Sequence, residues 1–113
     1  MSRAARLERL DVRREELEAE YETVLLDALH KVAAGSWGLF GHTNDRVMRA
    51  KWAPVVTDLC DRGEEIGQLR DQLGLAPFAL HGEFEASRGP VPPTAPGEPK
   101  QARAWLARLV EAN

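Results

Sequence analysis

Apolar residues recur every three or four positions along the first third of the chain, which is the period of an α-helix. These residues are Leu7, Leu10, Leu17, Tyr21, Val24, Leu25, Ala28, Leu29 and Val32. Ser2 suits the N-cap, and Gly35 suits the left-handed position that follows a helix end. The pattern therefore predicts one helix over residues 3–34, roughly 48 Å long at 1.5 Å per residue.

A second helical pattern runs from about Asp45 to Leu73. Its apolar residues are Val47, Met48, Trp52, Val55, Val56, Leu59, Cys60, Ile66, Leu69 and Leu73. Thr43 or Asn44 is expected to cap its start. Gly74 suits the position after its end, and Pro77 prevents continuation. Two long helices joined by nine residues predict a helical hairpin with antiparallel arms.

Two features inside the second pattern affect its geometry. Pro54 lacks a backbone N–H and costs about 3 kcal/mol in a helix interior, so we expect either a kink near residues 50–53 or a split into two helices at Pro54. Gly63 and Gly67 lie four residues apart, on one face of the helix. This spacing predicts that another helix approaches closely there.

The connector, residues 35–43, combines three glycines with three large apolar side chains, Trp37, Leu39 and Phe40. We interpret the apolar side chains as a plug that closes the end of the hairpin core. The alternative is that some stay exposed as anchors for a protein partner, since aromatic residues are favoured at interface hot spots. Glycines before a helix can hold a phosphate, but no Gly-Lys-Ser/Thr follows here.

The remaining third has weaker patterns. Residues 76–87 are expected to fold back on the hairpin as a short turn or one helical turn, and the segment 88–99, with five prolines and two glycines, is expected to form an extended strap. Pro99 suits the first position of a last helix that ends near Glu111 and packs through Trp105 and Leu109. No sustained period-two alternation occurs, so the sequence predicts a single all-α domain.

Charge is segregated along both helical patterns. Residues 3–14 carry net +3 and residues 15–27 net −6, whereas residues 45–52 carry +2 and residues 61–71 carry −2. An antiparallel hairpin is expected to set +3 beside −2, and −6 beside +2.

A hairpin this long offers more apolar length than one short C-terminal helix covers, so we predict a homodimer or higher oligomer joined through the long helices, most simply as a helical-bundle dimer. Two copies of the first helix lying antiparallel, as in a coiled coil, would also match basic halves to acidic halves.

Composition and charge limit the kinds of partner and of chemical site that the sequence predicts. The net charge of −3 favours neither nucleic acid nor an anionic membrane, and no run approaches the ~18 apolar residues of a membrane span, so we expect a soluble cytoplasmic protein. The one cysteine, Cys60, is expected to be buried and inert. The three histidines, His30, His42 and His81, lack metal-site spacing, and we expect no metal or cofactor. His42 and His81 meet only if residues 76–87 fold over the connector.

Two classes of function remain open. The favoured hypothesis is a non-enzymatic helical interaction, adaptor or regulatory protein that acts through oligomerisation and apolar anchors. The alternative is a small-ligand-binding or enzymatic domain with a pocket formed by Trp37, Phe40, His42 and His81. Convergence of these side chains on a concave pocket would favour the alternative, and an apolar patch along the long helices would favour the first hypothesis.

Overall fold

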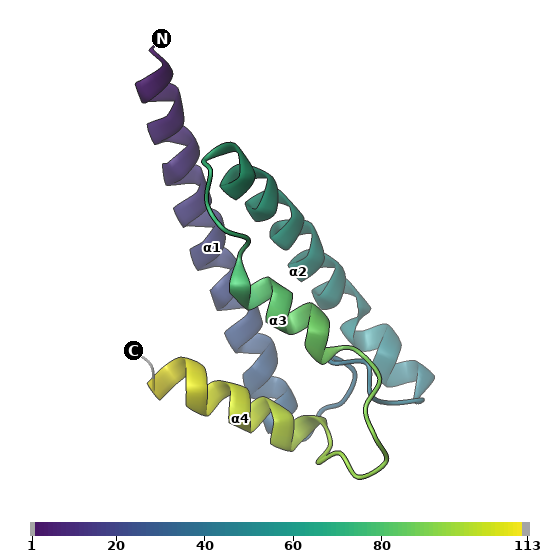
Figure 1. The fold of residues 1–113 in the computed structure, drawn as a ribbon. Helices are drawn as coiled ribbons and strands as arrows, with labels where there is room; N and C mark the ends of the chain where they lie inside the picture. Colours follow the sequence, from purple (N-terminus) through teal and green to yellow (C-terminus); the bar gives the residue numbers. More distant parts are fainter. Residues whose placement is uncertain (1, 112–113) are drawn as a thin grey trace.

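The computed structural model describes residues 2–111, and these residues form helices and connections without any strand. The helices are α1 (Arg3–Ala33), α2 (Arg46–Gln72), α3 (Ala79–Ser87) and α4 (Glu98–Glu111). In Figure 1, α1 and α2 lie side by side as an antiparallel hairpin, α3 lies against α2, and α4 crosses the C-terminal half of α1. The predicted hairpin with a C-terminal helix is confirmed.

Both long helices have side-chain caps at their starts. The Ser2 hydroxyl accepts the N–H of Ala5 at 3.1 Å, as expected. The α2 cap is Asp45 rather than Thr43 or Asn44, because Asp45 Oδ1 accepts two N–H groups of the first turn, at 2.9 and 3.2 Å. The negative charge of a carboxylate at this position is also stabilised by the positive end of the helix dipole, whereas a hydroxyl or an amide carries no charge.

The α2 helix is continuous through Pro54, so the prediction of two separate helices is wrong, while a kink stays a prediction. Pro54 and Ala50 are both exposed. The carbonyl of Ala50, which loses its usual N–H partner at Pro54, therefore lies on the solvent side of the helix, where water can take that place.

The predicted turn in residues 76–87 is a nine-residue helix, α3. Phe84 is fully buried, and Phe78 meets the Tyr21 ring edge to face with centroids 5.2 Å apart. Gly63 allows this approach, because a Cβ there would overlap the His81 ring. Gly67 has open space around it, so the expected close approach holds at the first glycine only.

The α4 helix begins at Glu98, one residue before the predicted start at Pro99. It packs on α1 through buried Ala102 and Trp105, with Leu109 half-buried, which confirms the predicted docking. Arg103 Nη1 donates to the Ala33 carbonyl at 2.9 Å and so satisfies one of the free carbonyls at the end of α1.

The core joins every helix with the connector. Its buried members are Leu17, Tyr21, Leu25, Ala28, Leu29, Val32, Leu39, Phe40, Trp52, Leu59, Ile66, Leu69, Phe84, Ala102 and Trp105. Within residues 2–111, no helix combines the length and the apolar character that crossing a membrane requires.

The charge prediction is confirmed in one half and wrong in the other. Arg13 and Glu65 pair across the hairpin at 3.6 Å, which sets the +3 segment beside the −2 segment. The acidic segment, however, pairs with bases late in α2, through Glu18–Arg70 at 2.7 Å and Glu20–Arg62 at 2.6 Å. Among the described residues, the basic side chains Arg46, Arg49 and Lys51 form no ion pair.

Candidate functional site

The connector between α1 and α2 has one defined conformation, which buried side chains and hydrogen bonds hold in place. Leu39 and Phe40 are fully buried at the end of the hairpin core, as the plug interpretation predicted for them, whereas Trp37, its third member, is only partly buried. Gly38 has φ 125°, and a Cβ there would lie 2.8 Å from Trp52 Cδ1. Only glycine combines that backbone conformation with that approach, so Gly38 lets Trp52 pack directly against the connector.

Glu98, the first residue of α4, holds the connector in place. Its side chain is 0% exposed, and its two carboxylate oxygens accept three connector N–H groups. The N–H of Phe40 donates to Oε1 at 2.8 Å, and those of Gly38 and His42 donate to Oε2 at 3.0 Å each. The buried charge thus faces three backbone dipoles and the positive end of α4.

Two further side chains fix the connector from other directions. Arg88, just after α3, donates through Nε to the Leu39 carbonyl at 3.0 Å. Trp52 of α2 donates through Nε1 to Ser36 Oγ at 2.9 Å. Because α2, the α3 end and α4 all bind the connector, its conformation depends on the complete fold.

Trp37 and His42 are partly exposed and line a cavity of about 300 Å³ between the connector and the strap. Trp37 lies over Gly97, where a Cβ would come 2.8 Å from its ring. The His42 ring is stacked on Phe40 with centroids 6.1 Å apart. The pocket hypothesis named four residues, and two of them line this cavity; Phe40 lies in the core and His81 lies elsewhere.

His81 belongs to a separate hydrogen-bond network. Its Nδ1 lies 2.7 Å from the Tyr21 hydroxyl, and its Nε2 lies 3.1 Å from Glu85 Oε1. In the tautomer protonated at Nε2, His81 accepts from Tyr21 and donates to Glu85. Phe40 and Phe84 separate it from His42, with successive centroids 6.1, 6.3 and 6.4 Å apart from His42 to His81. The histidine pair expected over the connector therefore does not form.

The hydroxyl and thiol groups in and near this hydrogen-bond network are unsuited to nucleophilic chemistry. Burial raises the pKa of the Tyr21 hydroxyl above its ordinary value of 10.0, and the negative charge that Cys60 gains when its thiol ionises, together with that of Glu85, raises it further. Burial also raises the pKa of the half-buried Cys60 thiol, again reinforced by Glu85. Both shifts favour the protonated, weakly nucleophilic form. The Tyr21–His81 hydrogen bond joins α1 to α3, and Glu85, on the same helix as His81, binds the other nitrogen of the imidazole.

Tyr21 gives the protein an alkaline limit of stability. Above pH 10 the unfolded chain releases the tyrosine proton while the folded chain keeps it, so the free energy of unfolding should fall as pH rises. Tyr21 is the one tyrosine of the sequence, so tyrosinate absorbance reports on it alone. We expect this absorbance to rise together with the loss of helical circular dichroism.

A Cys60→Ser variant provides the control for this alkaline titration. The Cys60 thiol also has a raised pKa, so its ionisation would likewise lower the free energy of unfolding as pH rises, and the variant removes that contribution. It should shift the transition only slightly. Tyrosinate absorbance that develops while the helical signal stays intact would contradict the burial argument.

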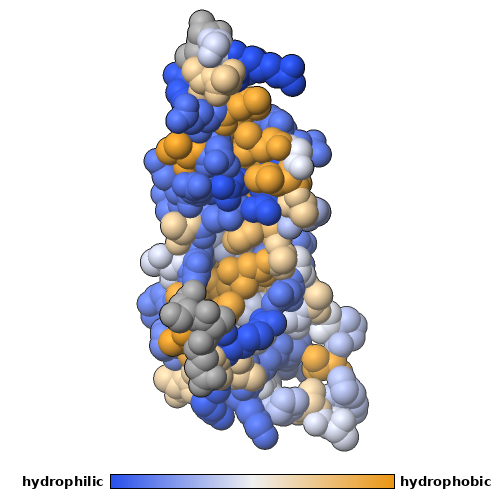
Figure 2. Space-filling view, turned by 60° about the vertical axis from the view of Figure 1, so that its left-hand side comes forward, coloured by the Kyte–Doolittle hydropathy of each residue, from blue (hydrophilic) through white to orange (hydrophobic). Residues whose placement is uncertain are grey.

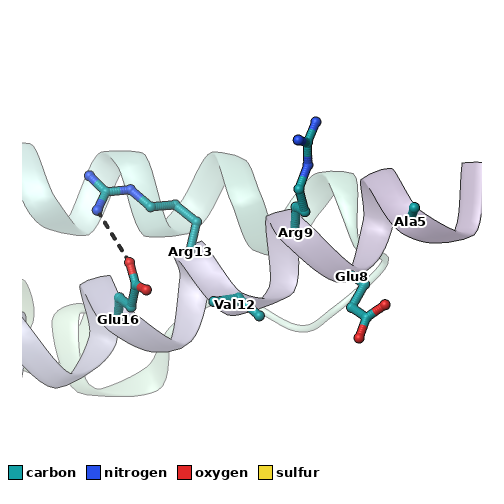
Figure 3. Close-up of a pocket in the computed structure, with 6 residues that line it drawn as sticks. All are labelled: Ala5, Glu8, Arg9, Val12, Arg13 and Glu16. Carbon is teal, nitrogen blue, oxygen red and sulfur yellow. Dashed lines mark ion pairs between the residues drawn. The ribbon is translucent and has the colours of Figure 1, made fainter. Parts of the chain in front are cut away.

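A second candidate surface lies on the outer side of α1, away from the core. Ala5, Glu8, Arg9, Val12, Arg13 and Glu16 line a shallow groove of about 540 Å³. In Figure 3, Val12 lies between Arg9 and Arg13 on one side and Glu8 on the other. Val12 is 51% exposed, and Arg13 pairs with Glu16 at 3.8 Å. The first turns of α1 extend past the end of α2 (Figure 1), whereas Arg13 of the groove still lies beside α2, where it pairs with Glu65.

The sequence analysis missed Glu98 and Arg88 as parts of the site. Glu98 follows a glycine and precedes a proline at a helix start, where an acid ordinarily complements the helix dipole from the surface. The N–H groups that donate to it lie 56 to 60 residues away along the chain, so no local pattern marks them.

Among residues 2–111, no group of three or more His, Cys, Asp or Glu side chains is arranged to hold a metal ion. No family model matches the chain, and no significant match was found among curated proteins or among solved structures.

Proposed function

We propose that the protein is a non-enzymatic helical interaction protein that self-associates through the outer face of α1. The observation that carries this proposal is the groove centred on Val12. Its floor is apolar, its edges are charged, and no other element of residues 2–111 covers it. Figure 2, in which the left-hand side of Figure 1 comes forward, shows apolar side chains that gather near the N-terminal end and again beside the end of α4.

The residues of the groove repeat at a spacing that suits a second helix. Ala5 and Val12 of the groove and Ala19 beyond it lie at intervals of seven residues, about two helical turns, so they form a narrow apolar stripe. A second copy of α1 that lies antiparallel on this stripe sets Val12 near Val12 of the partner subunit. Such pairing is isologous, because each copy contributes the same surface.

Charge favours the antiparallel orientation along one edge of the stripe. Arg9 and Glu16 lie seven residues apart on the same edge, on either side of Val12, and Arg9 forms no ion pair among the described residues. A two-fold axis near Val12 brings Arg9 of each copy opposite the acidic end of the other. Each exposed pair contributes a few tenths of a kcal/mol, so these charges select orientation more than they supply affinity.

The opposite edge carries Glu8 and Glu15, which the same pairing brings toward their counterparts. This repulsion weakens the dimer and gives the proposal a test by gain of affinity. A Glu8→Lys substitution converts the repulsive contact into an attractive one, so it should tighten the dimer several-fold. A different helix partner with a basic edge opposite Glu8 would bind the variant more weakly instead.

Sedimentation equilibrium at micromolar concentration tests the proposal, with 12.6 kDa as the protomer mass. Val12→Glu should weaken the dimer by about tenfold or more, since it places two charges at the centre of the contact. Val47→Glu is the matched control, because Val47 is 76% exposed on α2, outside the groove, and its substitution should leave the dimer unchanged. A monomeric wild type, or equal effects of the two substitutions, would exclude this interface.

A further inference from the structure

One end of the molecule combines exposed apolar side chains with basic ones. Figure 1 shows the connector, the start of α2 and the strap together at the end opposite the start of α1. A Cβ added to Gly38 of the connector would lie 2.8 Å from a backbone oxygen of α2, and Trp37 lines one cavity with Val91 of the strap. We call residues 34–51 and 88–100 the basic end.

The net charge of the whole chain conceals the charge of the basic end. The chain carries −3, whereas the basic end has five Lys or Arg residues and two acidic ones, a net charge of +3. Of the two acids, Glu98 is fully buried against the connector, and Asp45 is bound by two backbone N–H groups at the start of α2. The five basic residues are Arg46, Arg49, Lys51, Arg88 and Lys100.

Four of these basic side chains have no partner within residues 2–111. Arg46, Arg49, Lys51 and Lys100 form no ion pair and no side-chain hydrogen bond there, and all four are exposed. Their charges are therefore available to an external partner. Attraction adds over several charges and acts over roughly 10 Å at moderate salt, so it favours a partner with many negative charges over a single small anion.

Exposed apolar side chains lie among these bases. Val47 is 76% exposed on the first turn of α2, with Lys51 one turn further along the same face, and Val91 is 44% exposed on the strap. A partner helix laid along α2 follows one face of that helix, whereas a flat surface meets every segment that projects at this end. The interface of a bilayer accepts apolar side chains and, when its lipids are anionic, attracts bases beside them.

We propose that the basic end binds an anionic lipid surface. The four free bases attract the negative lipid headgroups, and the two exposed valines lie among those headgroups. Because two valines bury little apolar area, the contact is peripheral and reversible, and it depends mainly on charge. The basic end lies apart from the groove on the outer face of α1, so this inference does not depend on the proposed self-association.

Sedimentation with lipid vesicles tests the proposal. At low salt the protein should bind vesicles of equimolar phosphatidylserine and phosphatidylcholine but not vesicles of phosphatidylcholine alone, and high salt should release it. Each base near an anionic surface contributes about fivefold, so Arg46→Gln combined with Lys51→Gln should weaken binding by about twentyfold or more. Arg3→Gln combined with Arg6→Gln is the matched control, because it changes the net charge equally at exposed positions of the opposite end, and it should leave binding unchanged.

A second comparison tests the apolar contribution and the class of partner. Val47→Gln should weaken vesicle binding several-fold, whereas Val110→Gln, at a valine that is 55% exposed on α4, should have no effect. Soluble poly-glutamate should bind more weakly than vesicles at the same concentration of negative charge. Absence of binding to the phosphatidylserine vesicles, equal effects of the two double variants, or binding of poly-glutamate as tight as that of vesicles would overturn the proposal, the last in favour of an acidic polypeptide.

Discussion

Replacing Glu98 with glutamine should destabilise the protein by about 3–5 kcal/mol. Charge-assisted hydrogen bonds contribute roughly 1.5–3 kcal/mol each, and the three at Glu98 act on one segment, so their losses are not additive. Glutamine keeps one acceptor oxygen but places an NH₂ donor against connector N–H groups. At least one buried N–H then lacks an acceptor.

Thermal or denaturant unfolding measures the loss at Glu98, and amide hydrogen exchange locates it. Exchange at Gly38, Phe40 and His42 should accelerate more than exchange in the middle of α1. Glu64→Gln is the control, because Glu64 is exposed and forms no ion pair among residues 2–111. If Glu98→Gln and Glu64→Gln unfold alike, the carboxylate does not hold the connector.

Replacing Phe40 with alanine should cost about 3–5 kcal/mol, because Phe→Ala in a closed core removes apolar burial and leaves a cavity. Phe40 is fully buried, with ring centroids 6.0 Å from Trp105 and 6.3 Å from Phe84. For a chain of this length the loss corresponds to a fall of roughly 10–20 °C in Tm.

Phe78→Ala is the comparison for Phe40, since it removes the same side chain from a half-buried position at the edge of the core. Its effect on Tm should be clearly smaller. Equal losses would mean that Phe40 is no more important to the fold than a peripheral aromatic, and the plug interpretation would be wrong.

The helices were predictable because their signals are local. The seam from Leu7 to Val32, the cap at Ser2 and the stop at Gly35 belong to one continuous segment, and α1 follows them closely. In α3, by contrast, helical order comes from tertiary contacts. Phe84 packs into the core and His81 binds Tyr21, so a segment of weak periodicity forms more than two turns.

The arrangement of the site depended on contacts between distant segments. The charges of residues 45–52 were expected beside the acidic segment, but Glu18 and Glu20 reach Arg70 and Arg62 instead. The charge pattern alone does not fix which turns of the two helices lie side by side. Trp37 and His42 were named as candidates from composition alone. Their shared cavity requires the strap, which returns to the connector where α4 packs on α1 and Glu98 binds the connector.

The hydrogen bonds between Glu98 and the connector are also expected to affect the unfolding rate. They close a loop of 56 to 60 residues, and the entropic cost of closing a loop rises with its length. The α1–α2 hairpin can form from contacts nearer in sequence, so we expect α4 to dock after the rate-limiting step of folding. Glu98 then acts mainly as a latch on the unfolding rate: Glu98→Gln should shorten the lifetime of the native state while refolding stays nearly as fast as in the wild type.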